Sequence, residues 1–85
     1  MGTDNNRSAI VMGATSGIGF EVAKVLASRG WRVAVAGRRE NILASMTAET
    51  VGIVAYEVID VTSPQAAEAL CKLIDKMGGI NLYFH

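Results

Sequence analysis

The chain has 85 residues, enough for one domain with a modest core, because a chain of this size buries only about 60 to 65 per cent of its unfolded surface. Eight basic side chains balance eight acidic ones and 51% of the residues are hydrophobic, which excludes a disordered segment and a strongly charged surface for nucleic acid. No apolar stretch approaches the roughly eighteen residues that span a bilayer, the start lacks a secretory signal and Cys71 has no second thiol, so we expect a cytoplasmic protein without membrane contact, disulfide or metal.

The first third of the chain predicts a strand and then a helix. Residues 1–6 are polar, and we expect them to form a loose end. The continuous apolar run at 8–12 is typical of a parallel strand covered on both faces. Apolar residues then recur at i, i+4, i+7 and i+8, which predicts a helix with an apolar stripe. The stripe consists of Ile18, Val22, Val25 and Leu26. We expect this helix to end near Arg29, with Gly30 as a left-handed cap.

The middle of the chain predicts two further strands with a short helix between them. Residues 32–36 and 53–59 are rich in β-branched side chains, as strands are. Residues 40–48 can form a shorter helix around Leu43 and Met46.

A third helix follows the third strand. Ser63 is a capping residue and Pro64 suits the first helical position, so the helix is expected to start there. Thr62 with Gln65 offers an alternative capping box. The apolar side of the helix is lined by Ala66, Ala69, Leu70, Leu73, Ile74 and Met77.

Gly78 and Gly79 end the third helix, and residues 80–84 open a fourth strand. The predicted order is therefore β-α-β-α-β-α-β. Alternation of strands and helices across short loops indicates an α/β fold with right-handed crossovers and helices on both faces of a parallel sheet. We interpret residues 1–85 as the N-terminal half of a Rossmann-type doubly wound parallel sheet, a domain that is incomplete at its C-terminus.

The stretch GATSGIG, from Gly13 to Gly19, joins the first strand to the first helix. Such a turn points backbone N–H groups and the positive end of a helix at one place, which favours a diphosphate. We expect Gly13 to permit the turn, Gly17 to let the phosphates approach the backbone, and Gly19 to allow close packing of the helix. No Lys-Ser or Lys-Thr follows, which excludes the phosphate loop of nucleoside triphosphatases.

These residues resemble the N-terminal signature of the short-chain dehydrogenase/reductase family, T-G-x-x-x-G-[IL]-G. The signature matches at Gly13, Gly17, Ile18 and Gly19, and the resemblance runs over nearly the whole chain. Met12 replaces a threonine whose hydroxyl braces the turn in the family, so that brace is lost or replaced here. The resemblance implies a dinucleotide cofactor bound at this turn.

The end of the second strand distinguishes NADP(H) from NAD(H). NAD-binding sites of this type carry an acidic residue there, whereas this chain has Gly37 followed by Arg38 and Arg39. In the family, a basic residue directly after this position marks a preference for NADP. Cations are unfavourable at a helix start, and charge-assisted bonds to a 2′-phosphate would outweigh that cost. The alternative is that both arginines are solvated loop charges.

Four further residues are expected near the cofactor. The hydroxyls of Thr15 and Ser16 could donate hydrogen bonds to the phosphates. Asp60 and Val61 match the Asp-Val pair that, in the family, holds the adenine edge through a carboxylate and a backbone N–H; the competing interpretation of Asp60 is a plain helix-start residue. His85 stands where the family has the first asparagine of N-N-A-G, and we assign it no role.

The resemblance implies an NADP(H)-dependent oxidoreductase that interconverts a carbonyl and an alcohol by hydride transfer, commonly as a homo-oligomer. The family's catalytic Y-x-x-x-K pair is not in this chain, because Tyr56 and Tyr83 each lack a lysine four residues later. We therefore expect no catalytic residue here, and a small-molecule substrate site outside the chain. One alternative is a non-catalytic redox-sensing or scaffold protein with the same dinucleotide fold. Another is a proteolytic or truncated fragment whose exposed sheet edge drives self-association.

Overall fold

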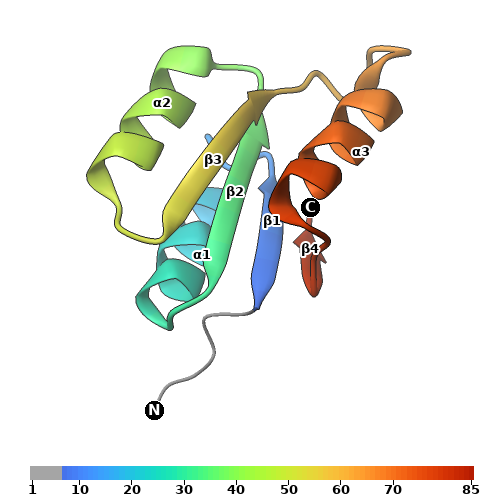
Figure 1. The fold of residues 1–85 in the computed structure, drawn as a ribbon. Helices are drawn as coiled ribbons and strands as arrows, with labels where there is room; N and C mark the ends of the chain where they lie inside the picture. The colour runs from blue at the N-terminus through green and yellow to red at the C-terminus, as the bar shows by residue number, and fades with distance from the viewer. Residues whose placement is uncertain (1–6) are drawn as a thin grey trace.

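The computed structural model describes residues 7–85, and the polar segment 1–6, expected as a loose end, lies outside the described residues. Four strands and three helices alternate along the described part (Figure 1). They are β1 (Ser8–Met12), α1 (Gly17–Ser28), β2 (Arg32–Gly37), α2 (Glu40–Glu49), β3 (Ile53–Val58), α3 (Ala66–Met77) and β4 (Leu82–Phe84). The expected order is confirmed, with most ends within one or two residues of the prediction.

The strands form one parallel sheet in the order β3-β2-β1-β4. The chain thus adds two strands on one side of β1 and then crosses over to add β4 on the other. In an open parallel sheet, ligands bind at the carboxyl ends of the strands where the direction of winding reverses. Here that point lies between β1 and β4, and the doubly wound α/β fold is confirmed.

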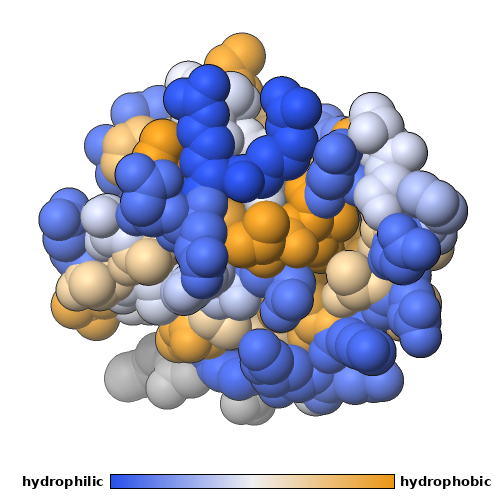
Figure 2. Space-filling model, turned by 90° about the horizontal axis from the view of Figure 1, so that it is seen from above, coloured by the Kyte–Doolittle hydropathy of each residue, from blue (hydrophilic) through white to orange (hydrophobic). Residues whose placement is uncertain are grey.

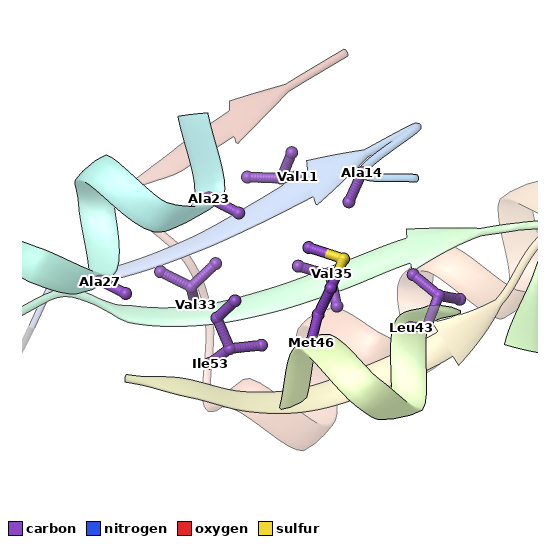
Figure 3. Packing of buried hydrophobic residues seen from close by; sticks show 9 residues of the cluster. All are labelled: Val11, Ala14, Ala23, Ala27, Val33, Val35, Leu43, Met46 and Ile53. Carbon is purple, nitrogen blue, oxygen red and sulfur yellow. The ribbon is translucent and has the colours of Figure 1, made fainter. Parts of the chain in front are cut away.

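Two hydrophobic clusters cover the two faces of the sheet, because side chains of a strand alternate between faces. On one face α1 and α2 pack against Val33 and Val35 of β2 (Figure 3). On the other face α3 packs through Leu73 and Met77 against Ile10 and Met12 of β1. β1 and β2 are buried almost throughout, which explains their continuous apolar sequence.

The side of α1 that packs on the sheet consists of small residues, Gly19, Ala23 and Ala27. Of the apolar stripe that predicted this helix, Val22 and Leu26 are partly buried and pack against the same cluster, whereas Ile18 is 74% exposed and Val25 is 47% exposed. Small side chains let the helix axis approach the strands closely, and Ile18 and Val25 are left on the exposed flank. The period of the stripe identifies the helix correctly, but only half of the stripe packs against the core.

The predicted start of α3 is wrong by two residues, because the helix begins at Ala66 after Gln65 rather than at Pro64. Ser63 still acts as a local cap: its Oγ accepts the N–H of Gln65 at 3.1 Å, and its carbonyl accepts the N–H of Ala66 at 3.1 Å. These bonds make a tight turn before the helix. The alternative capping box does not form, since the Thr62 hydroxyl donates to Asp60 instead.

The glycines that end helices behave as expected. Gly30 follows α1 with φ +88°, and Gly78 caps α3 with φ +76°, both left-handed. The next residue, Gly79, donates its N–H to the Ile74 carbonyl at 3.0 Å.

Polar contacts fasten the amino end of the sheet. Ser8 donates its N–H to Asn81 Oδ1 at 2.9 Å, and Asn81 returns its N–H to the Ser8 carbonyl at 2.7 Å. Arg32 donates to Ser8 Oγ at 3.2 Å and to the Met77 carbonyl at 3.3 Å. β1, β2, the end of α3 and the residue before β4 are thereby tied together. Of the helices in residues 7–85, none has the length and hydropathy to cross a membrane.

We predict that, of Gly17 and Gly19, only Gly19 is required for the stability of the folded protein. A Cβ added there would lie 2.5 Å from the Gly13 carbonyl oxygen, whereas one added at Gly17 would meet nothing within 4 Å. We expect Gly19→Ala to lower the free energy of unfolding by about 1–3 kcal/mol through steric overlap. Chemical denaturation measures this, with Gly17→Ala as the matched control. Equal stability of the two variants would contradict the packing argument.

Candidate functional site

A crevice of about 220 Å³ opens at the carboxyl ends of the strands. Figure 2, seen from above onto these strand ends, shows a hydrophobic area enclosed by hydrophilic side chains. All four strand ends contribute. The lining residues are Met12, Gly13, Thr15, Ser16, Gly37, Arg38, Ile59, Val61 and His85.

The turn after β1 is fastened to the neighbouring strand. Gly13 and Ala14 both donate their N–H groups to the Ala36 carbonyl, at 2.9 and 3.1 Å. Gly13 has φ +73°, a left-handed conformation that favours glycine. Met12 is 4% exposed and packs in the α3 cluster, so it has no part in polar bracing. The hydroxyl brace is therefore absent at Met12, and the two backbone bonds to β2 hold the turn.

Backbone donors gather where the turn enters α1. The N–H groups of Thr15, Gly17, Ile18 and Gly19 have no hydrogen-bond partner among residues 7–85. The latter three are the first donors of a helix, where the helix dipole is positive. Gly17 and Ile18 are exposed residues, whereas Gly19 is buried. This end of α1 can therefore donate hydrogen bonds to a phosphate oxygen.

The two hydroxyls of the turn differ in availability. Ser16 donates its hydroxyl to the Gly13 carbonyl at 2.9 Å, so it already has a partner within the turn. Thr15 faces the end of β2, because a Cβ placed on Gly37 would lie 3.4 Å from Thr15 Cγ2. A side chain longer than a methyl at Gly37 would thus compete with Thr15 for the same space.

The two arginines after β2 are also distinguished by position. Both are exposed, but Arg38 lines the crevice and Arg39 does not. Arg39 instead occupies the N-cap of α2 without making a side-chain cap bond. Within the described residues Arg38 has no ion pair within 4 Å, so its charge is available to an anion.

The turn after β3 is built around Asp60. Thr62 donates its hydroxyl and its backbone N–H to the same carboxylate oxygen, Oδ1, at 2.7 and 2.9 Å. The pKa of Asp60 is held below its ordinary value, mainly by the hydroxyl bond from Thr62 and then by the backbone bond from Thr62. The charge of Arg38 lowers the pKa to a smaller degree. Val61 is 51% exposed and lines the crevice, and its N–H has no partner in the described part of the chain.

The structure brings together only part of the predicted set. Gly13, Thr15, Ser16, Arg38 and Val61 line the crevice. The remaining predicted residues, which do not line it, are Gly17, Ile18, Gly19, Arg39 and Asp60. Of these, Gly17 and Ile18 border a separate apolar hollow along the flank of α1.

His85 lines the crevice although the sequence suggested no role for it. The parallel register pairs Val11 with Phe84, so the residue after β4 comes to lie beside the end of β1. The signal that identifies His85 is the strand order, because a fourth strand parallel to β1 puts the residue after it beside the end of β1. Among residues 7–85 no group of three or more His, Cys, Asp or Glu side chains is arranged to hold a metal ion.

We predict that Thr62 keeps Asp60 ionised to lower pH. Thr62→Val removes the hydroxyl bond and raises the pKa of Asp60 toward its ordinary value, while Thr62→Ser leaves the pKa low. Because folding favours the ionised form, the turn's contribution to stability is present above the ordinary carboxyl range and is lost as the pH falls through the lowered pKa. Carboxyl ¹³C NMR titration measures the shift. An unchanged pKa in Thr62→Val would show that the hydroxyl bond is unimportant.

Comparison with known proteins agrees with this geometry. Residues 7–84 match the short chain dehydrogenase family. An uncharacterized oxidoreductase of Staphylococcus haemolyticus is 39% identical over an aligned length of 84 residues, and the alignment covers 93% of this chain and 35% of that protein. A putative ketoacyl reductase of Streptomyces coelicolor is 36% identical over an aligned length of 86 positions including gaps, and the alignment covers 96% of this chain and 33% of that protein. The chain thus spans about a third of the length of these curated relatives.

A solved structure with the same arrangement is a variant of actinorhodin polyketide ketoreductase with NADPH. It superposes with a TM-score of 0.82 at 32% identity, covering 98% of this chain and 33% of that one. Fold, turn and family match thus coincide over the described residues, and this chain belongs to the short-chain dehydrogenase family of oxidoreductases.

Proposed function

We propose that this chain is the cofactor-binding portion of an NADP(H)-dependent oxidoreductase that interconverts a carbonyl and an alcohol. The observation that carries the proposal is the placement of Arg38 in the same crevice as the Gly13–Ser16 turn, next to a glycine at the end of β2. A cation in the crevice, beside a helix start whose first N–H groups have no partner among residues 7–85, suits a nucleotide with a second, separate phosphate.

The unpartnered N–H groups at the start of α1 supply donors for a diphosphate. The open space at Gly17 lets the phosphates come close to the backbone. In this proposal the first helical turn binds the diphosphate, and Arg38 binds the 2′-phosphate of the adenosine ribose. An acidic side chain in place of Gly37 would repel that phosphate, so its absence supports NADP(H) over NAD(H).

The adenine end of the nucleotide is assigned to the end of β3. Val61 lines the crevice with an N–H that has no partner among residues 7–85, and Asp60 precedes it with a carboxyl group of lowered pKa. The family resemblance assigns these two groups to the adenine edge. The nucleotide then extends along the strand ends in the order β3, β2, β1, with its base over β3 and its diphosphate over β1.

When bound, the nicotinamide ring supplies or accepts the hydride. The residues of this chain bind and orient the adenosine and diphosphate parts. A ketoreductase among the relatives and another among the solved neighbours support a carbonyl substrate for the whole protein. Oxidation of NADPH with a panel of ketones and aldehydes distinguishes an enzyme from a non-catalytic dinucleotide-binding protein.

Arg38→Ala is expected to weaken NADPH binding by about 1.5–3 kcal/mol, or roughly 10- to 150-fold, because one charge-assisted contact is lost. NADH, which has no 2′-phosphate, should lose less than about threefold, the range of a surface charge effect. Isothermal titration calorimetry with both nucleotides measures this. Arg39→Ala removes the same charge from the next position, outside the crevice, and should affect NADPH less. Equal losses for NADPH and NADH in Arg38→Ala would refute the 2′-phosphate role.

Gly17→Val tests the diphosphate site. The added side chain points into open space, so the protein should remain folded with its stability within about 0.5 kcal/mol of the parent. It would nevertheless cover the free N–H groups and reduce the affinity for NADPH and NADH alike by more than about tenfold. Calorimetric titration and thermal unfolding are measured together, with Gly17→Ala as the smaller step. Unchanged affinity in a folded Gly17→Val protein would place the phosphates elsewhere.

A further inference from the structure

The turn after β3 presents one hydrogen-bond acceptor and one donor that remain unused. Asp60 Oδ1 accepts both bonds from Thr62, which leaves Oδ2 without a partner among residues 7–85. One residue later, the Val61 N–H is also without a partner there. Asp60 and Val61 are adjacent in the chain, and Val61 lines the crevice.

An acceptor next to a donor is the complement of one edge of adenine. Adenine offers an amino group at position 6, which donates, beside the ring nitrogen N1, which accepts. Hypoxanthine has a carbonyl oxygen and an N–H at these two positions, so each contact would be reversed. A turn with this pair of groups can therefore distinguish the two bases.

The ionisation of Asp60 makes that distinction sharper. An ionised carboxylate only accepts hydrogen bonds, whereas a protonated one can also donate and would bond the carbonyl of hypoxanthine. Both bonds from Thr62 stabilise the ionised form. They also fix the rotation of the carboxylate, since two donors converge on one oxygen.

The threonine hydroxyl is not needed to form the turn itself. Ser63 donates its N–H to the Asp60 carbonyl at 2.9 Å, and the Thr62 N–H bonds the carboxylate independently of its side chain. The hydroxyl bond, at 2.7 Å, adds to a backbone turn that is already closed. Its removal is therefore expected to loosen the carboxylate and leave the turn in place.

We propose that Thr62 is a positioning residue that holds the Asp60 carboxylate for the amino group of adenine and so sets the preference for adenine over hypoxanthine in the bound nucleotide. The proposal rests on the proposed function, because it requires the nucleotide base to lie at the end of β3. Thr62 itself does not touch the base.

The test compares NADPH with its analogue in which hypoxanthine replaces adenine, by calorimetric titration of the parent, Thr62→Val and Thr62→Ser. The parent should prefer NADPH. Thr62→Val should lose about three- to tenfold in affinity for NADPH with little change for the analogue, as expected for one weakened charged hydrogen bond. Thr62→Ser, which keeps the hydroxyl, should restore the preference.

The matched control is Thr47→Val, which removes a hydroxyl bond to the Leu43 carbonyl on α2, away from the crevice. It should leave the ratio of the two affinities unchanged. An unchanged ratio in Thr62→Val, or equal losses for both nucleotides, would overturn the positioning role while leaving the proposed function intact. If the parent bound neither nucleotide, the proposed function and this inference would fail together.

Discussion

The carbonyl group of Ala36 holds the centre of the candidate site in place. It lies near the end of β2 and accepts the N–H groups of Gly13 and Ala14, which fastens the turn after β1 to the neighbouring strand. The left-handed conformation of Gly13 and the missing side chain of Gly19 allow the chain to turn within that space. Among residues 7–85 the first N–H groups of α1 have no partner, as at any helix start, and the closed turn places them beside the crevice, where the proposed function assigns them to a phosphate.

Charge is distributed along the strand ends in a way that separates the parts of a nucleotide. Arg38 follows β2, while the ionised Asp60 follows β3, the adjacent edge strand. A phosphate is attracted toward the first and repelled by the second, whereas an amino group on a base is attracted to the carboxylate. The proposed orientation of the nucleotide therefore follows from the order of the strands as much as from any one side chain.

The sequence predicted the elements and the parallel sheet because strands and helices here have distinct apolar periods. It could not predict that the most deeply buried residues of α1 are the small ones, Gly19, Ala23 and Ala27, because a hydrophobic pattern gives most weight to large residues. Of those large residues Val22 and Leu26 do pack against the core, whereas Ile18 is exposed. Within the site, the glycine turn was recognisable from its spacing. The difference between Arg38 and Arg39 depends on the direction of the chain as it enters α2, which composition does not contain.

The paired hydrogen bonds between Ser8 and Asn81 join residues 73 positions apart. Synthesis must therefore proceed 73 residues beyond Ser8 before β1 acquires its second neighbour. Until then one edge of β1, the most buried strand, is unpaired and can form hydrogen bonds with another nascent polypeptide. Contacts over such separations make folding slow, since the entropy of the long intervening loop is lost before they form. The crevice, to which the residue after β4 contributes, is accordingly completed later than the pairing of β1 with β2.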